Sequence, residues 1–446
     1  MSIPREQWAS RYGFVLASIG GAVGIGNIWR FSYIAGENGG AVFLLVYLAC
    51  VLLIGIPLMI AELTIGRRAQ GDAISAFESD KSPGQWHAVG RLAVAAAILL
   101  LSYYAIIAGW ALMYFIGAAT GALWRAAGAD YGGFFRQFIS DRGEPLAWQA
   151  ATLMLAMFIV AGGVRRGIER VNRLLIPFLA LIIVILATYA LSLPGAGTGV
   201  SFLFAPDWTS LRQPGMYAAA LGQAFFSLGI GMAFFVTYGS YMPRTFSLPA
   251  SAAIIAIGDT MFAIIAGLAI FPAVFALGGN PAAGPELAFI TLPQVLMQMP
   301  AGHLVGAVFF FLLSAAAITS MVALLEIPVA AITHRRRVLR WKTTATVGTA
   351  VFILGVPSAL SYGVLGEVRI WSLGILDAID HAVSNFLLPA IGILTALYVG
   401  WRLERGVALS ESDFGDTAIG RLWLWLIRLL VPLSILGILL QSTGAL

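Results

Sequence analysis

The chain has 446 residues, of which 60% are hydrophobic and 11% charged, and its mean hydropathy is +0.90. Soluble domains carry roughly 25% charged residues, so this composition excludes most soluble enzymes and indicates a protein whose main solvent is lipid. The 50 glycines and the net charge of +5 must be explained by where these residues lie.

Long apolar stretches recur along the whole chain. A helix of about 20 apolar residues crosses a bilayer, and about eleven stretches qualify. They cover residues 13–35, 41–66, 92–120, 147–163, 174–193, 215–241, 248–278, 302–333, 343–360, 373–401 and 422–442. We therefore expect an all-α polytopic membrane protein with about eleven transmembrane helices.

The basic residues follow the loops between these stretches. If the N-terminus is cytoplasmic, most of the 26 lysines and arginines lie in cytoplasmic loops, as the positive-inside rule requires. An odd number of spans then places the C-terminus outside. The basic excess is explained by topology, so a nucleic-acid partner is not expected, and nothing indicates an obligate protein partner.

The first and sixth spans share one peculiarity. Each carries Gly-Ile-Gly near its middle, at 24–26 and at 229–231. Glycine weakens a helix by about 1 kcal/mol relative to alanine, which predicts two broken helices, although such glycines can also serve tight helix packing. Spans one and six open two blocks of five, so we expect inverted repeats over 1–200 and 201–405, followed by a cytoplasmic linker and the last span over 406–446. Inverted repeats with broken helices indicate a secondary transporter with a site near the midplane.

Ionisable side chains inside spans are costly and usually functional. Arg30 and Asp380 fall toward the outer ends of their spans, where they can form a gate or a static ion pair. Asp259 is deeper and has no basic neighbour in sequence, so it requires a metal cation or a proton. Oxygen donors for a cation lie near the breaks, at Asn27, Ser227, Thr319 and Ser320. The sequence contains neither a phosphate-binding loop nor a paired nucleophile and base, so we expect no enzyme.

The motifs resemble those of one known family. The stretch from Trp8 to Arg11, the run Ala22-Val23-Gly24-Ile25-Gly26-Asn27-Ile28-Trp29-Arg30-Phe31 and the segment Glu37-Asn38-Gly39-Gly40 closely resemble the first span of the neurotransmitter:sodium symporter family. The likeness continues through Gly55-Ile56-Pro57, Gly66-Arg67, Tyr103-Tyr104, Gly222 to Leu228, Phe289 to Pro293 and Ile318-Thr319-Ser320. The resemblance implies a leucine-transporter-like fold, and the length is similar to that of the short bacterial amino-acid transporters, which lie in the inner (plasma) membrane.

The resemblance also implies two sodium sites. The first would use the Ala22 carbonyl, Asn27, Ser227, Asp259 and the substrate carboxylate. The second would use the carbonyls of Gly20, Val23 and Ala316 with the hydroxyls of Thr319 and Ser320. The Tyr104 hydroxyl and the amides near Gly24 and Gly26 would hold the substrate carboxylate, and the carbonyls of Ala22, Phe226 and Ser227 its ammonium group.

Three further features of the substrate site follow from the resemblance. Monoamine carriers have aspartate where this chain has Gly24, so glycine favours an α-amino acid. Asp259 replaces an asparagine of many relatives, and its fixed charge leads us to expect no chloride requirement. The side-chain pocket would be an apolar cup suited to hydrophobic or aromatic amino acids, lined by Ile19, Gly21, Leu100, Phe226, Gly229, Met232, Ser320, Met321 and Leu324.

The inner gate departs from the family pattern. Arg5, Trp8, Tyr241 and Glu326 are present, but the acidic partner usual for the N-terminal arginine is His334 here. We therefore do not expect the usual inner salt bridge: either Arg5 uses Glu326 or a carbonyl instead, or the closed-inside state is weaker.

The sequence as a whole predicts a sodium-coupled symporter that imports an amino acid by alternating access. A proton-coupled carrier of the same fold, in which Asp259 or Glu62 titrates, and a non-transporting amino-acid sensor remain as alternatives. Uptake in choline medium with a pH gradient would identify the proton-coupled carrier.

Overall fold

The structure is a computed structural model that describes residues 6–77, 86–128, 130–282, 284–336 and 338–442. Within these ranges the chain is almost entirely helical, and the one β-bridge joins Ile370 and Leu373. The expectation of an all-α membrane protein is confirmed.

Eight helical stretches among the described residues are long and apolar enough to cross a membrane. Four of them are single helices, namely α5 (His87–Ala119), α8 (Glu144–Ala161), α13 (Leu248–Ala276) and α15 (Gly302–Arg336). Two more are Ala41–Ala69, which contains α3 (Ala41–Cys50) and α4 (Ile56–Ala69), and Val164–Leu191, which ends in α9 (Arg170–Leu191). The last two are Ile375–Arg402, which contains α17 (Ile375–Ala382) and α18 (Leu388–Leu397), and Ala418–Leu440, which contains α20 (Ala418–Trp425) and most of α21 (Val431–Ser442). A ninth is the bent pair of α1 (Arg11–Ala22) and Gly26–Glu37, whose second half ends in α2 (Phe31–Glu37).

The other two expected spans are helical but shorter or more polar. The span at 215–241 is α11 (Pro214–Leu228) and α12 (Phe234–Ser240), and the span at 343–360 is α16 (Arg340–Ala359). Shorter helices lie between the spans, namely α6 (Ala122–Ala127), α7 (Tyr131–Ser140), α10 (Ala196–Phe204), α14 (Thr291–Gln298) and α19 (Arg405–Glu411).

Both glycine-rich spans are broken, as expected. Ser10 caps the start of α1 by accepting a hydrogen bond from the Gly13 amide, and the helix stops at Val23, whose ψ of 109° is extended. The two halves of this span meet at 55°. In the other span, Gly229 and Gly231 have φ of 71° and 83°, which glycine adopts without the steric penalty of a Cβ atom. Ala233 follows with a φ of 58°, so the break extends past the last glycine.

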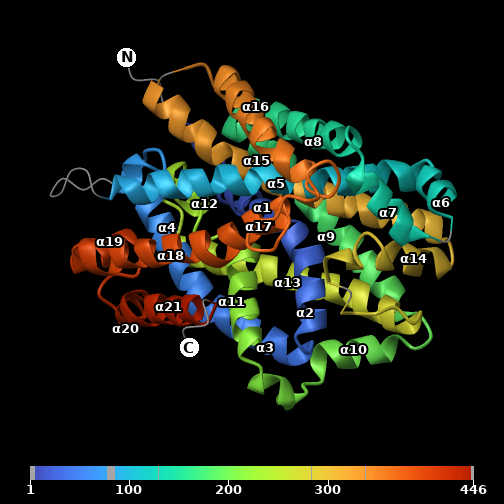
Figure 1. The fold of residues 1–446 in the computed structure, drawn as a ribbon. Coiled ribbons are helices and arrows are strands. Elements are labelled where there is room, and N and C mark those ends of the chain that lie inside the picture. Colours follow the sequence, from blue (N-terminus) through green and yellow to red (C-terminus); the bar gives the residue numbers. More distant parts are fainter. Residues whose placement is uncertain (1–5, 78–85, 129, 283, 337, 443–446) are drawn as a thin grey trace.

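Differences in burial show which helices form the centre of the protein. The most apolar part of α15 is 83% buried, whereas that of Ala418–Leu440 is 28% buried. α15 packs against α5, α8, α9 and α1, while α12 packs against α4. Figure 1 shows α1 and α12 in the middle of the molecule and α20 and α21 at its edge. The two broken spans are therefore enclosed by the other helices.

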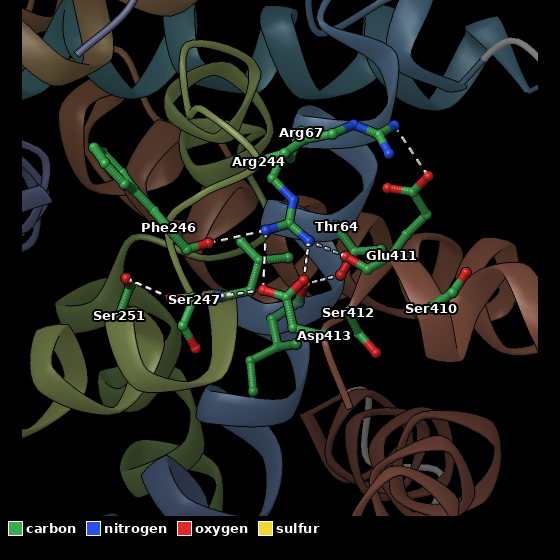
Figure 2. A network of polar contacts seen from close by, with 12 residues as sticks. Thr64, Arg67, Arg244, Phe246, Ser247, Ser251, Ser410, Glu411, Ser412 and Asp413 are labelled. Carbon is green, nitrogen blue, oxygen red and sulfur yellow. Dashed lines mark hydrogen bonds and ion pairs between the residues drawn. The ribbon is translucent and has the colours of Figure 1, made fainter. Parts of the chain in front are cut away.

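A polar joint connects helices that are far apart in the sequence. Arg67, near the end of α4, binds the carboxylate of Asp413 through both Nη atoms, at 2.5 and 2.9 Å. Its Nη1 also donates to the carbonyl of Phe246 at 3.0 Å, and the Leu248 amide donates to Asp413 at 2.8 Å. Figure 2 shows Phe246 and Asp413 around the Arg67 guanidinium. This Arg67 joint fixes α4, the start of α13 and the segment after α19 to one another.

Candidate ion and substrate site

Three fully buried polar side chains meet where the two breaks face α13. The Asn27 amide donates to Asp259 Oδ1 at 2.7 Å and to Ser227 Oγ at 3.0 Å. The Ser227 hydroxyl donates to Asp259 Oδ2 at 2.7 Å, and the Tyr47 hydroxyl lies 3.3 Å from Ser227 Oγ. Because a hydroxyl has one proton to donate, Ser227 accepts from both Asn27 and Tyr47. The donors of this cluster are therefore oriented toward the Asp259 carboxylate.

The Asp259 cluster has an uncompensated charge. Among the residues that the structure describes, the side-chain partners of Asp259 are Asn27 and Ser227, both neutral. A buried carboxylate without a cationic partner is costly, so the site favours a bound cation or a proton. Hard cations take oxygen ligands, which all three side chains supply. Ala22, the fourth expected ligand, ends α1 and lines the adjoining cavity.

The residues expected at the second sodium site lie between α1 and α15. Ser320 Oγ donates to the Val23 carbonyl at 3.2 Å, and Thr319 Oγ1 donates to the Ala316 carbonyl at 2.9 Å. Two hydroxyls and two carbonyls are thus already paired, and a cation would take over these same oxygens. Gly20 packs closely against α9, where an added Cβ would lie 1.9 Å from Asn172 Oδ1.

A small cavity adjoins both groups. Most of the expected substrate residues line it; the full lining is Gly21, Ala22, Gly24, Gly26, Leu100, Tyr104, Phe226, Gly229, Met232, Phe234, Ser320, Ala323 and Leu324. Ser227 belongs to the Asp259 cluster instead, Met321 does not line the cavity although it is fully buried, and Ile19 packs against Gly258. Phe234 and Ala323 are lining residues that the sequence reasoning missed.

One end of the cavity is polar. The Ile25 amide donates to the Tyr104 hydroxyl at 3.0 Å, so the Tyr104 proton can be donated to another acceptor. A Cβ atom on Gly24 would lie 2.5 Å from the Tyr104 hydroxyl and 2.3 Å from Ser320 Oγ. Position 24 therefore admits no side chain, and the space it leaves is bordered by two hydroxyl groups.

The residues expected to gate the outer side are close to the cavity but are not paired with each other. Arg30 donates to Gln223 Oε1 at 3.0 Å, and its guanidinium lies 4.6 Å from the centre of the Phe226 ring. Asp380 accepts hydrogen bonds from Tyr103 at 2.8 Å and from Ser384 at 2.9 Å. Across the described part of the chain, no ion pair joins Arg30 to Asp380.

The opposite side, which holds Trp8, is closed by a different network. Trp8 is 2% exposed and donates from Nε1 to the Tyr238 carbonyl at 3.0 Å. The Tyr241 hydroxyl donates to Glu326 at 2.7 Å, and Arg340 pairs with the other oxygen of Glu326. Arg5 lies outside the described residues, so its expected contact with Glu326 cannot be placed. Arg340 was not predicted as a partner of Glu326, because a basic residue at the end of a span is already explained by the positive-inside rule.

His334 has a separate role from the one its position suggested. Its Nδ1 lies 3.1 Å from Asp72 Oδ2, and Arg335 lies 3.2 Å from Asp72 Oδ1. Burial raises the pKa of Asp72, but hydrogen bonds from Ser75 and Ile74 and the Arg335 charge outweigh it and hold the pKa below its usual value. His334 thus anchors the loop after α4.

The chain is similar to known proteins over nearly its whole length. Residues 5–132 and 134–444 match the model of the sodium:neurotransmitter symporter family. The chain is 40% identical over 444 residues to the uncharacterized sodium-dependent transporter YhdH of Bacillus subtilis, covering 99% of this chain and 98% of that one. It is 33% identical to the uncharacterized sodium-dependent transporter MJ1319 of Methanocaldococcus jannaschii, covering 97% and 89%. The crystal structure of MhsT in complex with L-phenylalanine aligns with a TM-score of 0.92 and 49% identity, covering 99% of this chain and all of that one.

Proposed function

The chain belongs to the sodium:neurotransmitter symporter family, and from that premise we propose that it imports an α-amino acid together with sodium by alternating access. It is a sodium-dependent, multi-pass membrane transporter and not an enzyme. The amino-acid substrate, the number of sodium ions and the direction of insertion are the proposal.

The observation that carries the proposal is the Asp259 cluster. Its carboxylate is fully buried and its side-chain partners among the described residues are neutral, so a sodium ion is the partner that would balance its charge. The cluster borders the cavity through Ala22. A substrate carboxylate in the cavity would add a further oxygen ligand, which couples the binding of the two solutes.

The cavity favours an amino acid over a simple amine. Gly24 approaches the Tyr104 and Ser320 hydroxyls closely, and both of these groups line the cavity, where they can donate hydrogen bonds to a carboxylate. The rest of the lining, including Leu100, Met232 and Leu324, is apolar, which suits a hydrophobic or aromatic side chain. MhsT, which is similar over nearly the whole chain, was crystallised with L-phenylalanine.

We further propose two sodium sites and no chloride requirement. The second site uses the oxygens of Val23, Ala316, Thr319 and Ser320, with Gly20. Chloride is unnecessary because Asp259 already places a fixed negative charge beside the first ion.

The mechanism follows from these contacts. Sodium neutralises Asp259 and holds the broken spans together, and the substrate then completes the ion's ligands. Phe226 closes over the cavity with Arg30 and Asp380, and the Trp8 side subsequently opens. One charge moved through 100 mV provides about 2.3 kcal/mol, and a tenfold sodium gradient adds about 1.4 kcal/mol. One ion therefore supports a several-hundredfold accumulation.

The proposed orientation places the Trp8 side and the N-terminus in the cytoplasm and the C-terminus outside, in a bacterial plasma membrane. Under this orientation the basic clusters near Arg67, Arg165 and Arg335 are cytoplasmic, as the positive-inside rule requires.

The direct test is uptake of radiolabelled amino acids into proteoliposomes with an inward sodium gradient, compared with choline. We expect sodium-dependent accumulation of at least one hydrophobic amino acid, and loss of that accumulation in Asp259→Ala. Accumulation driven by a pH gradient in choline would instead indicate the proton-coupled carrier. Binding with sodium but no accumulation would indicate the sensor.

A further inference from the structure

The ring of Phe234 forms part of the cavity wall. Phe234 is the first residue of α12, directly after the break, and is 2% exposed. A Cβ atom built on Gly21 would lie 2.4 Å from Phe234 Cζ, and one built on Gly229 would lie 3.2 Å from Phe234 Cδ1. The two glycines, one from each broken span, therefore leave the space into which this ring fits.

The ring leaves little room beyond it. The free space in the cavity is about 30 Å³, and about 10–15 Å³ of such space holds one water molecule. The Tyr104 and Ser320 hydroxyls, which Gly24 approaches closely, form the polar part of the same lining. A substrate whose carboxylate binds these hydroxyls must therefore fit its side chain against the apolar part of the lining, which includes Phe234.

Phe234 is supported from behind by other aromatic rings. Its ring meets that of Tyr238 edge to face, with centroids 4.5 Å apart, and Tyr238 in turn lies 5.0 Å from Trp8. Trp8 is held by its hydrogen bond to the Tyr238 carbonyl. Because buried rings in a close-packed interior have few alternative positions, Phe234 cannot withdraw toward the Trp8 side without displacing Tyr238.

We infer that Phe234 is a specificity-determining residue that sets the upper size limit of the substrate side chain. This inference rests on the proposed amino-acid transport and concerns which amino acids fit best. With the ring in place, the cavity accepts hydrophobic or aromatic side chains only up to the size that the ring permits. Removing the ring joins its volume to the cavity, since Gly21 and Gly229 contribute no side chains that could fill it.

The test compares Phe234→Ala with Phe235→Ala. Phe235 is a matched control because it is also fully buried and its ring lies 4.4 Å from that of Phe234, but it does not line the cavity. Alanine, leucine, phenylalanine and tryptophan are each tested as inhibitors of sodium-dependent uptake of a radiolabelled amino acid. We expect the apparent affinity for tryptophan relative to alanine to rise at least tenfold in Phe234→Ala and to stay within twofold of the wild type in Phe235→Ala.

The inference is wrong if the relative apparent affinities for the four amino acids are the same in the wild type and in Phe234→Ala. It is also wrong if these relative affinities change equally in Phe234→Ala and Phe235→Ala. If Phe234→Ala does not fold, Phe234→Leu must give a smaller shift in the same direction, and no shift there also overturns the inference. Thermal stabilisation of the detergent-solubilised wild type by amino acids separates the two proposals. If no amino acid stabilises it in sodium, the proposed function is wrong; if amino acids do and the profiles match, only the size limit is wrong.

Discussion

Arg340 forms an ion pair with Glu326, a carboxylate that has no solvent exposure. Glu326 also accepts a hydrogen bond from Tyr241, and Arg340 donates from Nε to the Val160 carbonyl at 2.8 Å. One buried charge pair therefore ties α8, α15 and α16 to the residue that follows α12, on the side of the protein closed by Trp8.

Replacing Arg340 by alanine is expected to open that side. The change leaves Glu326 buried without a cation, which costs about 3–5 kcal/mol in the closed conformation and less where Glu326 gains water. The reaction of Ser240→Cys with a thiol reagent, measured in a Cys50→Ala background, should be at least tenfold faster with Arg340→Ala than with Arg340 present. Arg421→Ala is the control, because its pair with Asp416 is exposed; equal rates in the two variants would show that the Glu326 pair does not hold the closure.

Adding one methyl group at Gly24 should abolish substrate binding. The new Cβ would lie within 2.5 Å of the Ser320 and Tyr104 hydroxyls, and it would occupy the space proposed for the carboxylate. Gly222→Ala is the matched control in α11, since a Cβ there meets nothing within 4 Å. We expect Gly24→Ala to lose more than 90% of sodium-dependent uptake and Gly222→Ala to keep it; comparable uptake by both would remove the carboxylate site.

Uptake by the wild type should be the same in chloride and in gluconate, because Asp259 supplies the negative charge beside the first sodium ion. Asp259→Asn keeps the shape but removes that charge. We expect its sodium concentration for half-maximal uptake to rise at least tenfold, equivalent to about 1.4 kcal/mol. Loss of wild-type uptake in gluconate, or an unchanged sodium requirement in the variant, would contradict this assignment.

The Arg67 joint should contribute measurably to stability. In Asp413→Asn one acceptor becomes a donor that faces the Arg67 guanidinium, whose side chain is only 3% exposed. Hydrogen bonds to charged groups contribute about 1.5–3 kcal/mol, so the melting temperature in detergent should fall by several degrees. Asp416→Asn, at a site where the side chain is 64% exposed, should change it by less than one degree; equal melting temperatures for the two variants would mean that the joint adds no stability.

The breaks in the two spans were predictable because glycine pairs mark them in the sequence. The extension of the second break through Ala233 was not, since alanine rarely adopts a positive φ. Phe234 was missed for a related reason: an aromatic residue in an apolar helix carries no signal about which way its ring turns, and here the direction depends on Gly21 in another span. The family resemblance predicted most of the lining but not Phe234.

Arg340 illustrates a second limit. A basic residue at the start of a helix is fully accounted for by membrane topology, so no partner could be predicted for it from the sequence. Its contact with Glu326 depends on how α15 and α16 pack. The Asp259 cluster could be anticipated because a lone carboxylate in an apolar span requires a partner, whichever way the helices pack.

The Arg67 joint connects residues that are 346 positions apart in the chain. Ribosomes add about 5–20 residues per second, so Arg67 is synthesised roughly 20–70 s before the carboxylate that binds it. Nearly all of α4 is already made when this interval begins, and the start of α13 is made during it, but Asp413, which binds both, is made only at its end. Membrane insertion of most of the chain is thus complete before this contact can form, and the joint closes among the last steps of assembly.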